Sequence, residues 1–207
     1  MTNEEFSIIP APLQVHRLTG EFMLTAGTKI LVEPGNEPLM ALARSLSQQL
    51  ERATGYELTW DSTSIEHAPK GTIFVKTIPD DRDHASGESY TLEVLPRAVT
   101  ISALTPAGVS YGMQTLRQLF SPDIENRKPV ENVTSWILPA VRIVDEPRFR
   151  WRGLMLDTCR HFLGKGFGCR PVHSRKCTLY MGVLTNAYPN AFIHLHGLSR
   201  VPFRNQP

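Results

Sequence analysis

One short segment of the chain combines residue types that could contact a substrate. Asp157 is followed three residues later by Arg160, and His161 comes next. The arginine side chain carries a rigid fork of donors that can reach two neighbouring oxygens, and a nearby carboxylate can fix its orientation. Asp157 and Arg160 are therefore candidate binding residues, and an ordinary salt bridge at the end of a strand is the alternative. His161 suits a supporting hydrogen bond or simple packing.

A second group of residues, all in the last fifty positions, could bind a metal. Cys169, His173 and Cys177 follow one another at equal spacing, and His194 or His196 could complete a set of four zinc ligands. The spacing matches none of the established zinc-finger patterns. Since this part of the chain also has few aromatic residues for stacking, we predict no metal site and no nucleic-acid partner. A zinc-binding or polyanion-binding tail remains the alternative reading of these residues.

The charge of the chain is distributed unevenly along its length. It has 207 residues and a formal net charge of +2, but all 20 Asp and Glu residues lie at or before Asp157. Residues 158–207 contain no acid and hold seven Lys or Arg. No run of about eighteen apolar residues is present, so we predict no transmembrane segment. The acidic start, Met1–Glu5, does not resemble a secretory signal, and the compartment stays undetermined.

The elements that would position these residues are indicated by periodicity in the first 150 residues. Apolar residues recur at helical spacing over 37–54, where Pro38 suits the first turn and Gly55 suits the end. A second helix is predicted from Pro106 to Phe120, capped by Thr105. In this second helix Gly108 and Gly112 share one side, which predicts a close approach to a sheet.

The remaining periodic segments predict strands. Residues 22–32 indicate a strand or a hairpin, residues 72–77 a short strand, and 90–94 a half-buried strand that turns at 96–97 into a partner. The acidic loop at 80–84 is interpreted as solvated rather than as a metal site. Together these segments predict an α/β fold, a small mixed sheet with two helices on one face, and no catalytic motif of its own.

Two motifs resemble one protein family. They are AGVSYGMQTLRQL at residues 107–119 and PRFRWRGLMLDTCRHF at residues 147–162. In this order and at this spacing they are similar to glycoside hydrolase family 20, the β-N-acetylhexosaminidases, and the resemblance extends over residues 8–165. It implies an N-terminal α/β domain at 8–145, followed at 146–165 by the first strand of a (β/α)8 barrel. That strand would be Gly153–Asp157 in a truncated TIM barrel, and we expect its edges to stay unpaired.

The resemblance also implies a reaction and a role for the candidate residues. The family hydrolyses terminal non-reducing N-acetyl-D-hexosamine residues of glycans or chitin oligomers, without a cofactor, using the substrate's own acetamido oxygen as nucleophile. Arg160 would bind sugar hydroxyls in the −1 subsite, with Asp157 orienting it. The family's catalytic Asp–Glu pair lies further along the barrel, and Asp145–Glu146 precedes the first barrel strand. We therefore expect no catalytic residue in this chain and no hydrolysis by it.

Residues 166–207 form a basic tail that does not match the family. Two glycines and a proline within 166–171 oppose the helix that the family would have there. The abrupt loss of acids favours a shifted reading frame from about residue 165. A non-catalytic module that binds carbohydrate or protein is an alternative function for the N-terminal domain. The oligomeric state and the preferred hexosamine are not indicated by the sequence.

Overall fold

The computed structural model describes residues 6–64, 67–78, 86–131 and 135–149, and the backbone of three further strands at 153–155, 178–182 and 192–195. The chain divides into two compact units, Met1–Pro147 and Arg148–Pro207. Each unit contains its own sheet. The predicted acidic loop at 80–84 lies outside the described residues.

The first unit is a seven-stranded mixed sheet. Its strands are β1 (Gln14–Leu24), β2 (Lys29–Val32), β3 (Trp60–Ser62), β4 (Thr72–Thr77), β5 (Tyr90–Leu95), β6 (Ala98–Ala103) and β7 (Trp136–Asp145). They are ordered β1-β7-β5-β6-β4-β2-β3. Neighbours run parallel from β3 to β6 and antiparallel from β6 to β1, so the predicted mixed sheet is confirmed.

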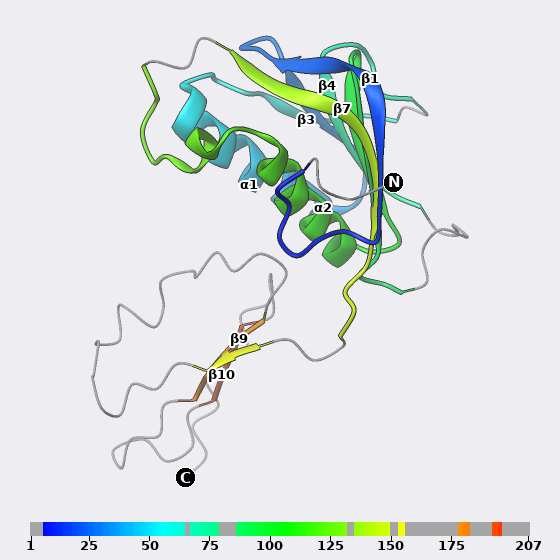
Figure 1. Ribbon diagram of the computed structural model, residues 1–207, viewed down its shortest axis with the longest axis vertical. Helices are drawn as coiled ribbons and strands as arrows, with labels where there is room; N and C mark the ends of the chain where they lie inside the picture. Colours follow the sequence, from blue (N-terminus) through cyan, green and yellow to red (C-terminus); the bar gives the residue numbers. More distant parts are fainter. Residues whose placement is uncertain are drawn as a thin grey trace. The chain divides into compact units, whose positions relative to one another are not determined.

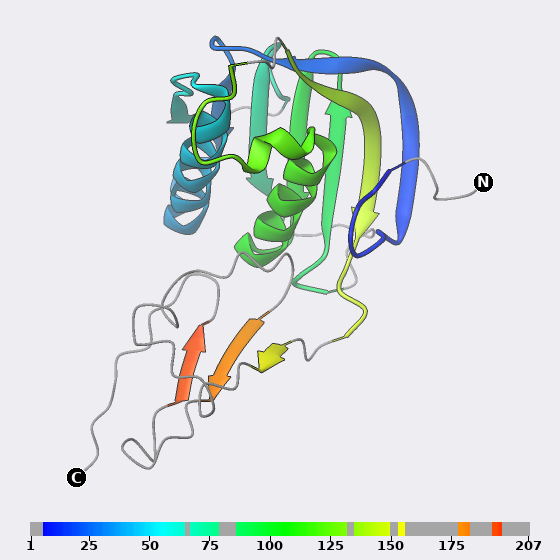
Figure 2. The same cartoon turned by 60° about the vertical axis from the view of Figure 1, so that its left-hand side comes forward.

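Two helices cover one face of this sheet, as predicted. They are α1 (Glu37–Thr54) and α2 (Pro106–Leu119), and a short 3-10 helix, η1 (Pro122–Glu125), follows α2. Both views of the ribbon place α1 and α2 side by side on the same side of the sheet (Figures 1 and 2). Within the residues that the structure describes, neither helix is long and apolar enough to cross a membrane.

Helix α1 has the bounds that its sequence pattern predicts. The side chain of Asn36 accepts a hydrogen bond from the Leu39 N–H at 3.3 Å, which satisfies a donor that the first turn leaves open. At the other end Gly55 adopts a left-handed φ of 70° and its N–H bonds to the Glu51 carbonyl at 2.8 Å. Hydrogen bonds to nearby residues therefore fix both ends of the helix. Burial of its apolar stripe supplies the remaining stabilisation.

Helix α2 lies very close to the sheet because two of its residues are glycines. A Cβ atom on Gly108 would lie 2.3 Å from the Ser89 carbonyl oxygen, and one on Gly112 would lie 2.7 Å from Cγ2 of Ile101. Thr105 caps the helix by accepting the Gly108 N–H at 3.5 Å. The predicted cap and close approach are confirmed, and the helix ends at Leu119 rather than Phe120.

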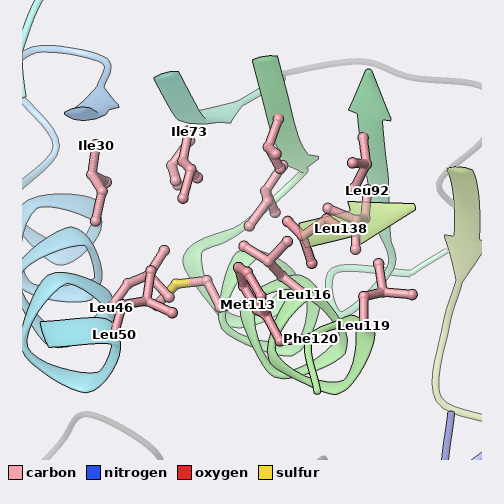
Figure 3. Packing of buried hydrophobic residues seen from close by; sticks show 14 of the residues in the cluster. Ile30, Leu46, Leu50, Ile73, Leu92, Met113, Leu116, Leu119, Phe120 and Leu138 are labelled. Atoms are coloured by element: carbon pink, nitrogen blue, oxygen red, sulfur yellow. The ribbon is translucent and has the colours of Figure 1, made fainter. Parts of the chain in front are cut away.

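The core of the first unit lies between the sheet and the two helices (Figure 3). The labelled side chains come from both layers, Ile30, Ile73, Leu92 and Leu138 from strands and Leu46, Leu50, Met113, Leu116, Leu119 and Phe120 from the helical side. Each fully buried Leu or Ile contributes about 1.5–3 kcal/mol relative to an exposed one. The predicted strands at 72–77 and 90–94, and the turn into β6, are confirmed.

The prediction of one strand or hairpin over residues 22–32 is wrong. The segment contains the end of β1 and all of β2, which pair with other strands rather than with each other. Between them the Thr28 N–H bonds to the Thr25 carbonyl at 2.9 Å, and the Thr25 N–H bonds to Thr28 Oγ1 at 3.0 Å. This turn directs β2 to the far side of the sheet.

The partner of β1 is not predicted from the sequence. Strand β7 pairs with it antiparallel, but the register shifts between Arg17 and Glu21 of β1. On β7 the alternation of buried and exposed residues breaks at Ala140 and Val141, which are both buried, beside Pro139. Because an irregular ladder and an internal proline both weaken a strand pattern, β7 could not be identified from periodicity. The short strand β3 was also missed.

The second unit contains a three-stranded sheet of β8 (Gly153–Met155), β9 (Thr178–Gly182) and β10 (Phe192–Leu195). Strand β8 pairs parallel with β9, and β9 pairs antiparallel with β10. The expectation that both edges of β8 would stay unpaired is therefore wrong for one edge, where β9 supplies a hydrogen-bonded neighbour. Strand β8 ends at Met155, two residues short of the prediction, and a barrel strand at this position remains a prediction.

Candidate functional site

The candidate binding residues Asp157 and Arg160, together with His161, lie outside the residues that the structure describes. Strand β8 ends at Met155, two residues before Asp157, so the candidate residues directly follow a strand in the sequence. The candidate zinc ligands Cys169, His173, Cys177 and His196 also lie outside the described residues, and His194 belongs to strand β10. The roles assigned to these residues remain predictions.

The adjacent acids Asp145 and Glu146, in contrast, are well described, and Asp145 ends strand β7. Only 5% of Asp145 is exposed. Its Oδ1 accepts the Leu13 N–H at 3.2 Å, and its Oδ2 accepts the Tyr90 hydroxyl at 2.9 Å. Charge-assisted hydrogen bonds of this kind are needed to compensate the cost of burying a carboxylate. Asp145 therefore joins three segments of the scaffold.

The Tyr90 hydroxyl links this carboxylate to helix α2. It lies 2.5 Å from Oγ1 of Thr115, and neither Tyr90 nor Thr115 is exposed to solvent. Burial, and next the negative charge of Asp145, raise the pKa of the Tyr90 phenol far above its ordinary value near 10. The phenol therefore stays protonated and continues to donate to Asp145. Periodicity places Tyr90 on the apolar side of a strand, but it does not indicate that its hydroxyl meets that of Thr115.

Glu146 is also bound within the scaffold. Its Oε2 accepts a hydrogen bond from Oγ of Ser89 at 3.0 Å. Ser89 is itself buried, and its Oγ lies 3.0 Å from Oγ of Ser86. Both acids thus have hydrogen-bonded partners within the first unit. Those of Asp145 are Leu13 and Tyr90, and that of Glu146 is Ser89. This arrangement fastens the end of β7 to the domain and suits a structural role.

The carboxyl ends of the parallel strands are the usual place for a ligand in an α/β sheet. Here the polar side chains at that edge cap the starts of the helices or bond to the residues next to the caps. Glu33, after β2, accepts hydrogen bonds from the Thr77 hydroxyl and from Nδ2 of Asn36, and Asn36 caps α1. After β6, Thr105 caps α2 and donates to the Gly87 carbonyl. These contacts stabilise the two helix starts.

Two further kinds of site are relevant here, a metal centre and a surface pocket. Among the described residues, no three His, Cys, Asp or Glu side chains form a group that could hold a metal ion. An open hollow on the surface is lined by residues 17–21, the segment in which the register of β1 shifts. Since one short backbone segment forms this hollow, it lacks the converging side chains that define a binding pocket.

The family of the chain follows from comparison with known proteins. The family model described as glycosyl hydrolase family 20, domain 2, matches residues 5–146. That match spans more than half of the chain, which therefore belongs to glycosyl hydrolase family 20. It covers the first unit described above, including all seven strands and both helices.

Similar proteins carry related names. A beta-hexosaminidase from Porphyromonas gingivalis is 34% identical over 157 residues, which are 76% of this chain and 19% of that protein. A beta-hexosaminidase from Vibrio furnissii is 31% identical over 156 residues, covering 75% of this chain and 22% of that protein. The chain thus spans about a fifth of the length of these curated relatives.

Solved structures show the same fold. The GH20 beta-N-acetylhexosaminidase from Streptomyces coelicolor A3(2) has a TM-score of 0.67 and 32% identity, over 76% of this chain and 30% of that one. A mutant Streptomyces plicatus beta-hexosaminidase in complex with the product GlcNAc has a TM-score of 0.66 and 33% identity, over 76% of this chain and 29% of that one. The predicted family and the mixed sheet with two helices are both confirmed.

Proposed function

We propose that the chain supplies the N-terminal α/β domain and the first barrel strand of a β-N-acetylhexosaminidase. The longer enzyme would remove terminal non-reducing N-acetyl-D-hexosamine residues from glycans or chitin oligomers. The observation that carries this proposal is the match of residues 5–146 to domain 2 of family 20. The motif at 147–162 supports it independently, because it lies beyond that match and has the spacing of the family's first barrel strand.

The proposed chemistry uses the substrate as its own nucleophile. The oxygen of the 2-acetamido group attacks the anomeric carbon, and the bond to the leaving oxygen breaks as an enzyme carboxylic acid protonates that oxygen. Water then opens the cyclic intermediate and returns the proton. In this scheme an aspartate orients the acetamido group and an adjacent glutamate is the acid, and no cofactor is needed.

We assign sugar binding, rather than proton transfer, to the residues after β8. Arg160 would donate to sugar hydroxyls in the −1 subsite, and Asp157 would orient the guanidinium. Active sites of (β/α)8 barrels are built at the carboxyl ends of their strands, and these two residues follow a strand closely in sequence.

A polypeptide of these 207 residues should not hydrolyse the substrate by itself. No acid follows Asp157, and the Asp145–Glu146 pair is hydrogen-bonded to Leu13, Tyr90 and Ser89 within the scaffold. The first unit would then act as the platform on which the barrel folds.

Release of a chromophore from an aryl N-acetyl-β-glucosaminide tests the proposal. The 207-residue polypeptide should show no turnover. A chimera that joins residues 1–165 to the remainder of the Streptomyces plicatus relative should hydrolyse the substrate, and the complete relative is the positive control. Turnover by the short polypeptide at ordinary enzymatic rates, on the order of 1–10³ per second, would contradict it. So would a folded chimera that binds no GlcNAc.

A further inference from the structure

The segment that precedes β1 is fastened to the domain in an unusual way. Residues 6–13, the N-terminal strap, loop back beside α2 and the end of β7 before the chain enters β1 (Figure 1). The strap contains Pro10 and Pro12, which have no N–H and cannot take part in a regular ladder. Its attachment must therefore come from other contacts.

Two of these contacts are side-chain acceptors for backbone donors of the strap. The Ile9 N–H bonds to Oε1 of Gln118 on α2 at 2.8 Å. The Leu13 N–H bonds to Oδ1 of Asp145 at 3.2 Å. Directly before Ile9 the strap is also held by burial, since only 4% of Ile8 is exposed and it belongs to the main core.

The two acceptors differ in what else they join. Asp145 is the last residue of β7, and its second oxygen accepts the Tyr90 hydroxyl, which in turn lies 2.5 Å from Oγ1 of Thr115. One buried carboxylate therefore connects the strap, the end of β7 and the start of β5, and the Tyr90 hydroxyl extends these contacts to helix α2. Gln118 connects the strap to α2, its own helix, by a hydrogen bond that the structure places at an exposed position.

We propose that Asp145 is a latch that closes the N-terminal strap onto the end of β7, so that the two open and close as one unit. Local unfolding in proteins proceeds in cooperative segments, and the members of a segment share contacts that are lost together. Strands β1 and β7 are already paired from Gln14 opposite Val144 onward, and the latch extends this coupling beyond the ladder to Leu13. The device is independent of the proposed hydrolysis.

Native-state hydrogen exchange of the 207-residue polypeptide tests the latch without any substitution. In rising denaturant, the Leu13 amide and the hydrogen-bonded amides of residues 141–144 should follow one opening curve. Separate curves, with Leu13 exchanging through an opening of its own at lower free energy, would overturn the proposal.

Substitutions then distinguish the latch from general stabilisation. Asp145→Ala should raise the exchange rate of the Leu13 amide by at least about tenfold, because one charge-assisted hydrogen bond is lost. Asp145→Asn keeps an oxygen acceptor and should retain most of the protection. The matched control is Gln118→Ala, which should raise exchange at Ile9 and leave Leu13 unchanged. Equal acceleration of all sheet amides by Asp145→Ala, or an unchanged Leu13 rate, would assign Asp145 to stability alone.

Discussion

The two units of the chain carry different kinds of information. Met1–Pro147 holds a seven-stranded sheet, two capped helices and a buried core, and its periodic pattern corresponds to burial in the structure. The described residues of Arg148–Pro207 form three strands of 3, 5 and 4 residues, and its sequence holds all three cysteines and a single acid, Asp157. The proposed chemistry nevertheless depends on the second unit. The fold of the first unit can thus be derived from its own residues, whereas the sugar-binding role proposed for Arg160 would depend on residues of a complete barrel.

The largest expected effect concerns the origin of the basic tail, residues 166–207, in the second unit. If residues 166–207 are translated in a shifted frame, an alternative frame of the gene from about codon 165 should encode a different continuation. We expect an acid-containing helix, then a strand with a His-x-His-like motif, and later an adjacent Asp–Glu pair. Sequencing the gene through this region checks the prediction. If neither alternative frame encodes such elements, the basic tail is a genuine segment. The contrast in composition between the two units would then belong to the protein itself.

The next effect concerns Arg160 in the active chimera described above. Arg160→Ala should lower kcat/KM by about a thousandfold, which corresponds to about 4 kcal/mol, because a charged donor to the bound sugar is lost. Arg160→Lys keeps the charge but loses the fork of donors, so its kcat/KM should lie between those of the wild type and Arg160→Ala. Steady-state kinetics with the aryl substrate measure this. Unchanged kcat/KM in a folded Arg160→Ala variant would assign Arg160 to structure alone.

A smaller effect concerns the close contact between α2 and the sheet in the first unit. In Gly108→Ala the new Cβ would lie 2.3 Å from a backbone oxygen. We expect the free energy of unfolding to fall by about 3 kcal/mol, in the upper part of the range for overpacking. Gly27→Ala is the control, because its Cβ would have Thr25 Oγ1 as its nearest neighbour, at 3.8 Å. Denaturant unfolding measures both. Equal stability of the two variants would mean that α2 can shift away from the sheet at little cost.

The same glycines show how far the sequence leads. Gly108 and Gly112 predict a close approach because they share one side of a predicted helix, and the helix ends at Gly55 and Thr105 are local signals. Such features depend on neighbours within a few residues. The pairing of β1 with β7 joins positions more than a hundred residues apart, and the shift in its ladder disturbs the alternation that would reveal it. Only the folded chain brings those segments together.

The candidate site divides in the same way. Asp157 and Arg160 were identified from a motif, and their roles stay predictions because the described residues do not include them. The Asp145–Tyr90–Thr115 cluster is not predicted by the sequence, although Tyr90 and Thr115 each lie in an element that the sequence predicts. Its members come from three elements, and no spacing in the sequence indicates that their side chains meet. Position in the fold, rather than residue type, gives Asp145 its partners.

The smallest effect concerns that buried cluster. Tyr90→Phe should destabilise the first unit by about 1.5 kcal/mol at neutral pH, since Asp145 and Thr115 both lose a hydroxyl partner. The shape of the ring is retained, so no cavity adds to the cost. Tyr56→Phe, which removes the hydroxyl of a half-buried tyrosine, is the matched control. Equal unfolding free energies for the two variants would show that the Tyr90 hydroxyl contributes no net stability.

The pH dependence of this variant follows from the raised pKa of Tyr90. Burial and the charge of Asp145 favour the protonated phenol in the folded state, so the folded protein holds this proton more tightly than the unfolded chain does. The resulting stability is fully present below the unfolded pKa near 10 and is lost as the pH rises above that value. One proton contributes a slope of about 1.4 kcal/mol per pH unit. We therefore expect the unfolding free energy above pH 10 to fall more steeply in the wild type than in Tyr90→Phe. Parallel curves for wild type and Tyr90→Phe would mean that the phenol ionises within the folded domain, and that the cluster around Asp145 tolerates a second negative charge.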